Sequence, residues 1–224
     1  DSIKRIDSDL DADVVLDSFI YKENLYISFS KKNENCQKIK IAKATLNLNF
    51  LKFKNIFQPE ECGANVQSGK MAFYKHENNP GLLLSTSEHP YDTPNNKPQI
   101  NESIYGKILF FDFKTDNYLI FSKGHRNAQG LFVKDNIILS TEHGPRGGDE
   151  INRIFYKKNY GWPIASYGEP YESKKLMHKK SHAKNNFEEP LYAFLPSIGI
   201  SELILLPNTF NQKWNNNALV TSLN

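Results

Sequence analysis

Residues 124–163 read GHRNAQGLFVKDNIILSTEHGPRGGDEINRIFYKKNYGWP, and this stretch carries the strongest information on fold and function. Two of its segments, GHRNAQG and EHGPRGGDE, are dense in Gly, Arg, Asn, His and carboxylates, so neither can be a core strand. Each lies close to the end of a short apolar run. Because polar loops on a rigid scaffold are where ligands often bind, the stretch predicts a ligand site at strand ends.

Strand patterns dominate the rest of the chain, and no segment keeps the spacing of an amphipathic helix over three turns. Turn sequences such as ENNPG at 77–81, KTDN at 114–117 and KDN at 134–136 separate the apolar runs. Many short antiparallel strands predict an all-β sandwich, barrel or propeller, and the pattern alone does not choose among them. The expected strands are 25–30, 38–46, 70–74, 81–87, 106–113, 118–123, 131–134, 136–141, 152–156, 200–206 and 217–223.

Composition limits the class of protein. The chain has 224 residues, which is enough to bury a sizeable core. Its formal net charge of +3 gives no strong field toward nucleic acid, so no nucleic-acid partner is expected. No run of 18 apolar residues occurs, so no membrane span is expected in this segment. The chain opens at Asp1 without a charged and then apolar leader, so any signal peptide is expected to be removed or to lie outside it.

Three motifs follow one another in the order GHRNAQGL, EHGPRGGDEIN and NYGWP. In this order and at these spacings they resemble the glucose/sorbosone dehydrogenase family, the soluble PQQ-dependent glucose and aldose sugar dehydrogenases. DADVVLDSFIYKENLYISFS near the start and LPSIGISELI near the end extend the similarity over nearly the whole chain. The resemblance implies an oxidoreductase and a six-bladed β-propeller with its active site over the central channel.

The resemblance also implies that residues 1–224 form a single partial propeller domain, with roughly three to four blades of four-stranded antiparallel sheet. An open arc of blades would expose two long sheet edges, which proteins avoid. Further blades are therefore expected outside both ends.

Arg126, Asn127 and Gln129 stand at the positions of GHRNxQ that grip PQQ in the family, and Gln67 of the QSG segment is placed with them. PQQ is a planar tricarboxylate, and an Arg fork with amide donors matches planar anionic oxygens. The alternative is that these side chains tie a tight turn by bonding local carbonyls.

The resemblance further implies calcium. Gly144 and Pro145 match the backbone carbonyls that hold the ion bridging PQQ, and Glu150 and Tyr160 match a second, structural calcium site. The alternatives are a Gly-rich hairpin whose carbonyls face water, and a solvated turn pair at Asp149 and Glu150.

The family's general base is a histidine that precedes the QSG segment, and this chain departs from the family there. The segment reads CGANVQSGK, which puts Val66 at the base position and Asn65 at the neighbouring acidic one. A valine cannot accept a proton, and losing a base typically costs about two to four orders of magnitude in rate. We expect Val66 to point into a concavity shared with Arg126 and Pro145. His125 and His143 are the nearest substitutes by motif, and a purely structural role is favoured for both.

Cys36 and Cys62 both lie in polar sequence, 26 residues apart. A disulfide and a reduced pair of core residues are left as alternatives, since geometry cannot be read from spacing. His178 and His182 form an i, i+4 pair, but in a Lys-rich segment without helical periodicity, so a solvated insertion is favoured over a metal site. Trp162 and Trp214 are expected to pack in the core or between blades.

Two functions of different class follow. The first is a quinoprotein that oxidises aldoses with PQQ and calcium; the second is a calcium-stabilised propeller without catalysis that binds a saccharide or a protein partner. Val66 favours the second and the intact motifs favour the first. The resemblance implies an extracytoplasmic location, periplasmic or secreted, and is compatible with a homodimer.

Overall fold

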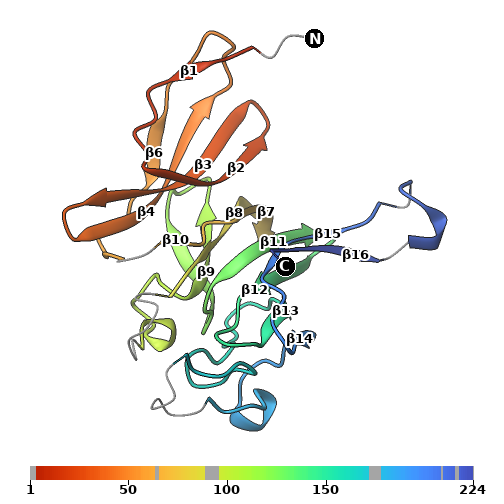
Figure 1. Cartoon of the computed structure of the whole chain (residues 1–224). Coiled ribbons are helices and arrows are strands. Elements are labelled where there is room, and N and C mark those ends of the chain that lie inside the picture. The colour runs from red at the N-terminus through yellow and green to blue at the C-terminus, as the bar shows by residue number, and fades with distance from the viewer. Residues whose placement is uncertain are drawn as a thin grey trace.

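A computed structural model of the chain describes residues 4–63, 66–88, 96–171, 178–207, 209–214 and 217–223. It contains three four-stranded antiparallel sheets, which follow one another along the chain (Figure 1). The strand orders are β2-β3-β4-β6, β10-β9-β8-β7 and β11-β12-β13-β14. The predicted all-β class with four-stranded antiparallel sheets is confirmed, and consecutive four-stranded sheets are the blades of a propeller.

The first sheet is formed by β2 (Val14–Tyr21), β3 (Asn24–Asn33), β4 (Cys36–Thr45) and β6 (Lys54–Phe57). The second is formed by β7 (Met71–His76), β8 (Asn79–Thr86), β9 (Lys107–Asp112) and β10 (Tyr118–Lys123). The third is formed by β11 (Ala128–Lys134), β12 (Ile137–Glu142), β13 (Asp149–Arg153) and β14 (Tyr192–Phe194).

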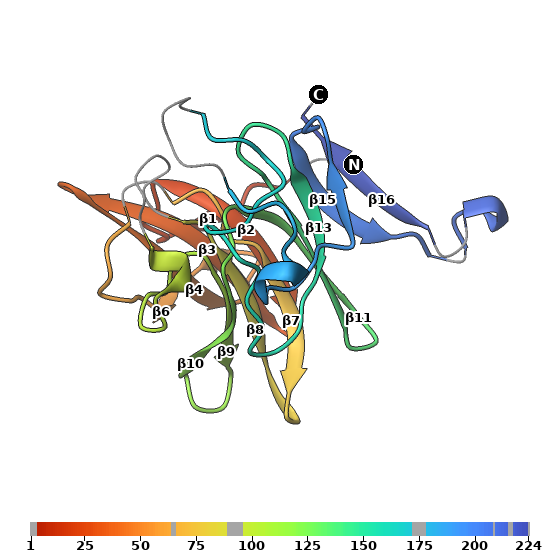
Figure 2. The same ribbon diagram turned by 90° about the horizontal axis from the view of Figure 1, so that it is seen from below.

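Smaller elements complete the described structure. β15 (Ile200–Leu205) and β16 (Ala218–Ser222) form a hairpin that projects beyond the third sheet, and Figure 2 shows the same hairpin from below. β1 (Asp7–Ser8) and β5 (Phe50–Leu51) make a short parallel pair. The described helices are three short 3-10 turns, η1 (Lys97–Gln99), η2 (Ala183–Asn185) and η3 (Gln212–Trp214).

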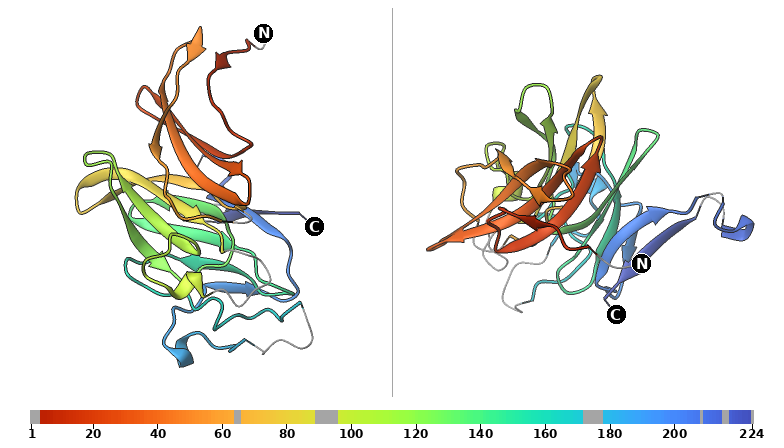
Figure 3. Two further views of the ribbon diagram at one scale, coloured as in Figure 1. Left: turned by 90° about the vertical axis from the view of Figure 1, so that its left-hand side faces the viewer. Right: turned by 90° about the horizontal axis from the view of Figure 1, so that it is seen from above.

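The middle sheet is buried on both faces, which explains its continuous apolar runs. Successive side chains of a strand point to opposite faces, so Leu82 and Leu84 pack toward the first sheet while Leu83 packs toward the third. Phe111 and Phe110 divide between the same two clusters. The three sheets therefore share two apolar interfaces. Figure 3 shows the arrangement of the sheets in two further views.

Turn chemistry sets the hairpins of the second and third sheets. Glu77 and Asn78 both have positive φ between β7 and β8, and Asp135 and Asn136 do so between β11 and β12. Two consecutive positive φ values are the mark of a type I′ turn, whose twist matches that of antiparallel strands. The turns expected at 77–81 and 134–136 are confirmed.

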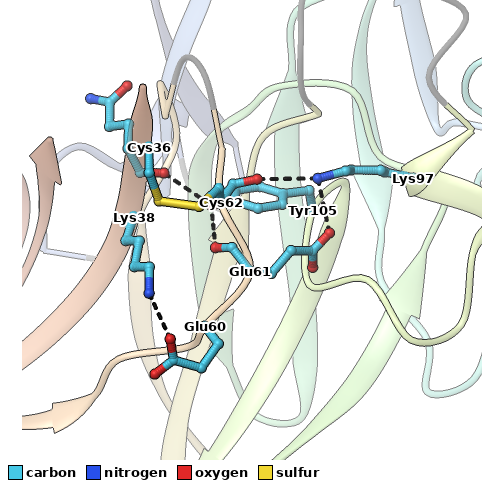
Figure 4. Close-up of a disulfide and its surroundings, with 8 residues drawn as sticks. Cys36, Lys38, Glu60, Glu61, Cys62, Lys97 and Tyr105 are labelled. Atoms are coloured by element: carbon cyan, nitrogen blue, oxygen red, sulfur yellow. Dashed lines mark hydrogen bonds and ion pairs between the residues drawn. A yellow bond between two sulfur atoms is a disulfide. The ribbon is translucent and has the colours of Figure 1, made fainter. Parts of the chain in front are cut away.

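Cys36 and Cys62 form a disulfide with Cα atoms 5.1 Å apart (Figure 4). The bond lies beside a backbone bridge in which Gln37 and Gly63 exchange N–H···O bonds of 2.9 and 2.7 Å. Lys38 also pairs with Glu60 at 2.9 Å (Figure 4). The crosslink fixes the loop that leads from the first sheet into residues 66–70.

The helices found in the described ranges are too short to cross a lipid bilayer.

Replacing Cys36 and Cys62 together by serine is expected to lower the free energy of unfolding by about 3 kcal/mol, because the crosslink closes a 26-residue separation. Denaturant unfolding of the oxidised wild type and the double variant measures the loss. A reducing agent should bring the wild-type midpoint down to that of the variant and leave the variant unchanged. Equal midpoints for oxidised wild type and variant would contradict the expectation.

Candidate functional site

The GHRN and EHGP loops are joined by a buried carboxylate at the end of β12. Oε2 of Glu142 lies 3.0 Å from Nδ1 of His125, and Oε1 accepts a short hydrogen bond from the backbone N–H of Arg126. The backbone N–H of His143 donates to the Asn127 carbonyl at 3.0 Å. The start of β11 and the end of β12 thus form one polar unit.

His125 has a structural position. Its side chain is buried, with one ring nitrogen bound to Glu142 and Nε2 lying 2.8 Å from the Ser122 hydroxyl. Its ring also stacks on Tyr160 with centroids 4.6 Å apart. Because both nitrogens are engaged and shielded from solvent, His125 in this arrangement cannot reach a substrate hydroxyl.

The guanidinium of Arg126 is buried within the third sheet's loops. Nη1 donates to the carbonyl oxygens of His143 and Gly144, each at 2.9 Å. Nε lies 3.6 Å from the carboxylate of Glu88, and the group sits over the Trp162 ring at 5.3 Å. The indole N–H of Trp162 donates a short hydrogen bond to Glu88. Arg126 therefore orients the 143–144 backbone.

Three amide side chains meet next to this unit. Nε2 of Gln129 donates to Oδ1 of Asn127 at 2.7 Å and to the backbone carbonyl of Gln67 at 3.1 Å, and Nδ2 of Asn127 donates to Oε1 of Gln67 at 3.4 Å. The Ser68 hydroxyl also donates to Oδ1 of Asn127, at 3.2 Å. The structure thus brings together the predicted cofactor residues Gln67, Asn127 and Gln129, and Gln67 is exposed.

Val66 is placed differently from the expectation. Its side chain belongs to the apolar cluster between the first and second sheets, with Met71 and Tyr105, and its backbone N–H donates to Oε1 of Gln37 at 3.0 Å. It does not line the cavity beside Arg126. The reason is chemical: an aliphatic side chain gains more by joining the apolar interface than by facing polar loops. Asn65 lies outside the described residues.

Asp149, which the sequence analysis named only as part of a solvated turn pair, is a buried acceptor. Oδ1 accepts from the Gly144 N–H at 3.0 Å and from the Ser197 hydroxyl at 2.8 Å. Oδ2 accepts from the N–H groups of Ile198 and Ile200 at 3.1 and 3.0 Å. The alternative of a solvated turn pair is therefore wrong, since Asp149 and Glu150 are both buried. Asp149 ties the Gly144 loop to the segment entering β15.

Glu150 and Tyr160, predicted as ligands of a structural calcium ion, line a common cavity of about 10 Å³ together with Arg126 and His182. Oε1 of Glu150 lies 3.6 Å from Nε2 of His182, and Oε2 accepts from the Asn152 amide at 3.2 Å. Burial, reinforced by the neighbouring Glu142 carboxyl, raises the pKa of Glu150 well above its ordinary value. Burial lowers the pKa of His182.

This donor set does not fit calcium. The ion prefers six to eight oxygen ligands, and here a histidine nitrogen and a permanently charged guanidinium line the same cavity. Among the described residues no cluster of three or more His, Cys, Asp or Glu side chains is arranged to hold a metal ion.

The remaining candidates lie as follows. Nε2 of His143 donates a short hydrogen bond to the Ile200 carbonyl, and Pro145 is buried and packs close to Gly168. The solvated insertion expected around His178 and His182 is wrong at both residues: His182 is buried, and Nδ1 of half-buried His178 bonds the Pro163 carbonyl at 2.8 Å.

The two tryptophans lie in different environments. Trp162 is buried, as expected, whereas Trp214 in η3 is exposed, because η3 lies at the projecting tip of the β15–β16 hairpin.

Sequence reasoning missed Glu88 and Glu142, although a signal exists. Glu142 is the last residue of a buried strand and Glu88 lies two residues beyond one, after ST and STS respectively. A carboxylate at that point is directed at the loop between the second and third sheets.

Replacing Asp149 by Asn should lower the free energy of unfolding by at least about 3 kcal/mol, since one face of the carboxylate loses two acceptor bonds in a buried site. Denaturant unfolding checks this. Glu169→Gln is the matched control, because Glu169 is half-exposed in its pair with Lys180 and should change stability by about 1 kcal/mol or less. Similar small losses in both variants would refute the role given to Asp149.

Comparison with known proteins shows which family this chain resembles. Residues 10–224 match the family model for glucose/sorbosone dehydrogenases. The aldose sugar dehydrogenase YliI of Escherichia coli is 34% identical over 106 residues, which are 46% of this chain and 29% of that protein. The quinoprotein glucose dehydrogenase B of Acinetobacter calcoaceticus is 50% identical over 50 residues, 21% of this chain and 10% of that protein.

A crystal structure of a glucose dehydrogenase superposes with a TM-score of 0.80 at 25% identity, covering 93% of this chain and 66% of that one. The described blades therefore correspond to part of a longer propeller in these relatives. Since the family model spans nearly the whole sequence, the chain belongs to the glucose/sorbosone dehydrogenase family.

Proposed function

We propose that the whole protein containing these blades is a quinoprotein of the aldose dehydrogenase type that binds PQQ. The observation that carries the proposal is the joining of the two signature loops by Glu142, with the amide cluster beside them. Two relatives support it, an aldose sugar dehydrogenase and a quinoprotein glucose dehydrogenase. The substrate class is an aldose or another small saccharide.

The amide cluster fits PQQ in chemical kind. Planar anionic oxygens accept from amide N–H groups, and the exposed Gln67 gives the cluster of Gln67, Asn127 and Gln129 an open side. PQQ, when bound, would supply the two-electron oxidation. The chain's own part is to hold and orient the group. Arg126 supports the cofactor site indirectly, because its guanidinium binds the carbonyls of residues 143 and 144.

A calcium ion next to the cofactor would use the carbonyl oxygens of Gly144 and Pro145. The Gly144 carbonyl accepts a 2.9 Å hydrogen bond from Arg126, so the guanidinium would have to withdraw for a cation to bind there. The proposal of calcium at this loop therefore includes a change in the Arg126 side chain.

Proton removal is the step for which the described residues offer least. Val66 is packed between sheets and His125 has both nitrogens engaged. Without a positioned base, turnover should be slower by about two to four orders of magnitude. This favours a second candidate, a propeller that binds a saccharide or a protein partner without oxidising it.

The proposal extends to the setting of the protein. Further blades beyond residues 1–224 would cover the edges of the first sheet and of the β15–β16 hairpin. An extracytoplasmic location is supported by the Cys36–Cys62 disulfide, since such bonds persist in oxidising compartments. A homodimer belongs to the same proposal.

A dye-reduction assay on the full-length protein with glucose, PQQ and calcium tests the catalytic proposal. We expect turnover at least about a hundredfold below that of a family member with a histidine base. Bound PQQ with no turnover would favour the binding role. Turnover at the rate of such a relative would contradict the loss of the base.

Gln67→Leu should weaken PQQ binding about tenfold, the equivalent of one hydrogen bond, because its amide is the exposed member of the cluster. An absorbance titration of the full-length apoprotein with PQQ measures the dissociation constant. Gln58→Leu is the control, since Gln58 is also an exposed glutamine and directly follows β6, outside the amide cluster. Equal affinities for both variants would remove Gln67 from the site.

A further inference from the structure

We propose that the imidazole of His182, rather than a calcium ion, holds Glu150 and braces the loop that follows NYGWP. The inference concerns residues outside the proposed sugar-oxidising step, so it stands or falls independently of catalysis. It rests on which groups surround Glu150.

Several side-chain acceptors around the cavity already have hydrogen-bond donors or a facing imidazole. Glu142 is bound to His125 and to the backbone N–H of Arg126. Oε2 of Glu150 accepts from Asn152, and its Oε1 lies 3.6 Å from Nε2 of His182. The Ser166 hydroxyl accepts from the Gly168 N–H at 3.1 Å.

The kinds of side chain in the cavity also disfavour calcium. Arg126 and His182 line it together with Glu142 and Glu150, and neither the guanidinium nor the imidazole can supply an oxygen ligand. A calcium ion would lie next to the permanent positive charge of Arg126. The imidazole supplies a contact to Glu150 without that cost.

Both the backbone and the side chain of His182 are held in place by neighbouring residues. Its carbonyl accepts from the N–H groups of Asn185 and Phe187 at 2.9 and 3.0 Å, which closes the turn of η2. Its ring lies against Tyr167 with centroids 5.3 Å apart. The side chain thus joins the 178–189 segment to Tyr167 and to β13 at one point.

The backbone of this segment returns onto the loop after NYGWP. The N–H of Ser166 donates to the Lys179 carbonyl, and the N–H of Lys179 donates to the Ile164 carbonyl, each at 3.0 Å. Lys180 Nζ binds the Gly168 carbonyl at 2.8 Å. Residues 164–168 and 179–180 are therefore already joined by hydrogen bonds close to His182. An ion is not needed to bring these two segments together.

The test compares melting temperatures of the full-length protein in EDTA and in calcium chloride. Any calcium ion at Gly144 and Pro145 contributes equally to wild type and Glu150→Gln, because it uses backbone carbonyls. We therefore expect the same calcium-dependent shift, zero included, in both proteins. A wild-type shift that disappears in Glu150→Gln would overturn the proposal.

A second variant tests the position of His182 directly. His182→Asp removes the imidazole and places a carboxylate next to Glu150, so its melting temperature in EDTA should fall by roughly 4–8 °C. Calcium should then restore at least half of that loss, because two carboxylates now face each other.

His178→Asp is the matched control. It introduces the same charge into the same segment, but His178 contacts Pro163 and Trp162 instead of Glu150, so calcium should not rescue it. A folded His182→Asp protein that calcium stabilises no more than this control would also overturn the proposal. If His182→Asp does not fold, the comparison of wild type with Glu150→Gln still decides.

Discussion

The carboxylate of Glu142 is buried at the end of β12, and it accepts from the backbone of Arg126 while contacting the ring of His125. Such a charge is tolerated in the interior only when its oxygens are satisfied, and here both of them are. The bond fixes how the GHRN loop turns into β11. The direction of the Arg126 side chain, and hence the shape of the 143–144 backbone, depends on it.

Much of the fold follows from local pattern. The strand expected at 118–123 is β10 without change, and the run at 106–113 contains β9. β9 is buried along nearly its whole length and β10 contains a short run of apolar residues, so their signal is strong. By contrast β14 has three residues and lies between two prolines, and the apolar run of β2 is interrupted by Asp17 and Ser18, so neither was expected as a strand. β13 begins at Asp149, earlier than the strand expected at 152–156. The prediction missed this start because the first two residues of β13 are acids, which the structure buries.

The sequence predicted which loops form the site, but not which side chains contact one another there. Motif order placed Gln67, Asn127 and Gln129 in one site, and the structure brings them together. No local pattern could indicate that Glu88, far from the GHRN loop in sequence, would neutralise Arg126. The same holds for His182, whose Lys-rich context suggested solvent. Pairings of this kind depend on how blades pack, which short-range sequence does not encode.

The disulfide has a consequence for how the chain responds to proteases. Cys36 and Cys62 enclose the end of the first sheet, including the exposed Leu46, Leu48 and Phe50. A single cut at this exposed stretch would leave both fragments covalently joined, since the bond spans the nick. The loop that carries Val66 and Gln67 would stay tethered through Cys62 to β4. The first blade can thus be broken in its backbone without being released from the blades that carry the site.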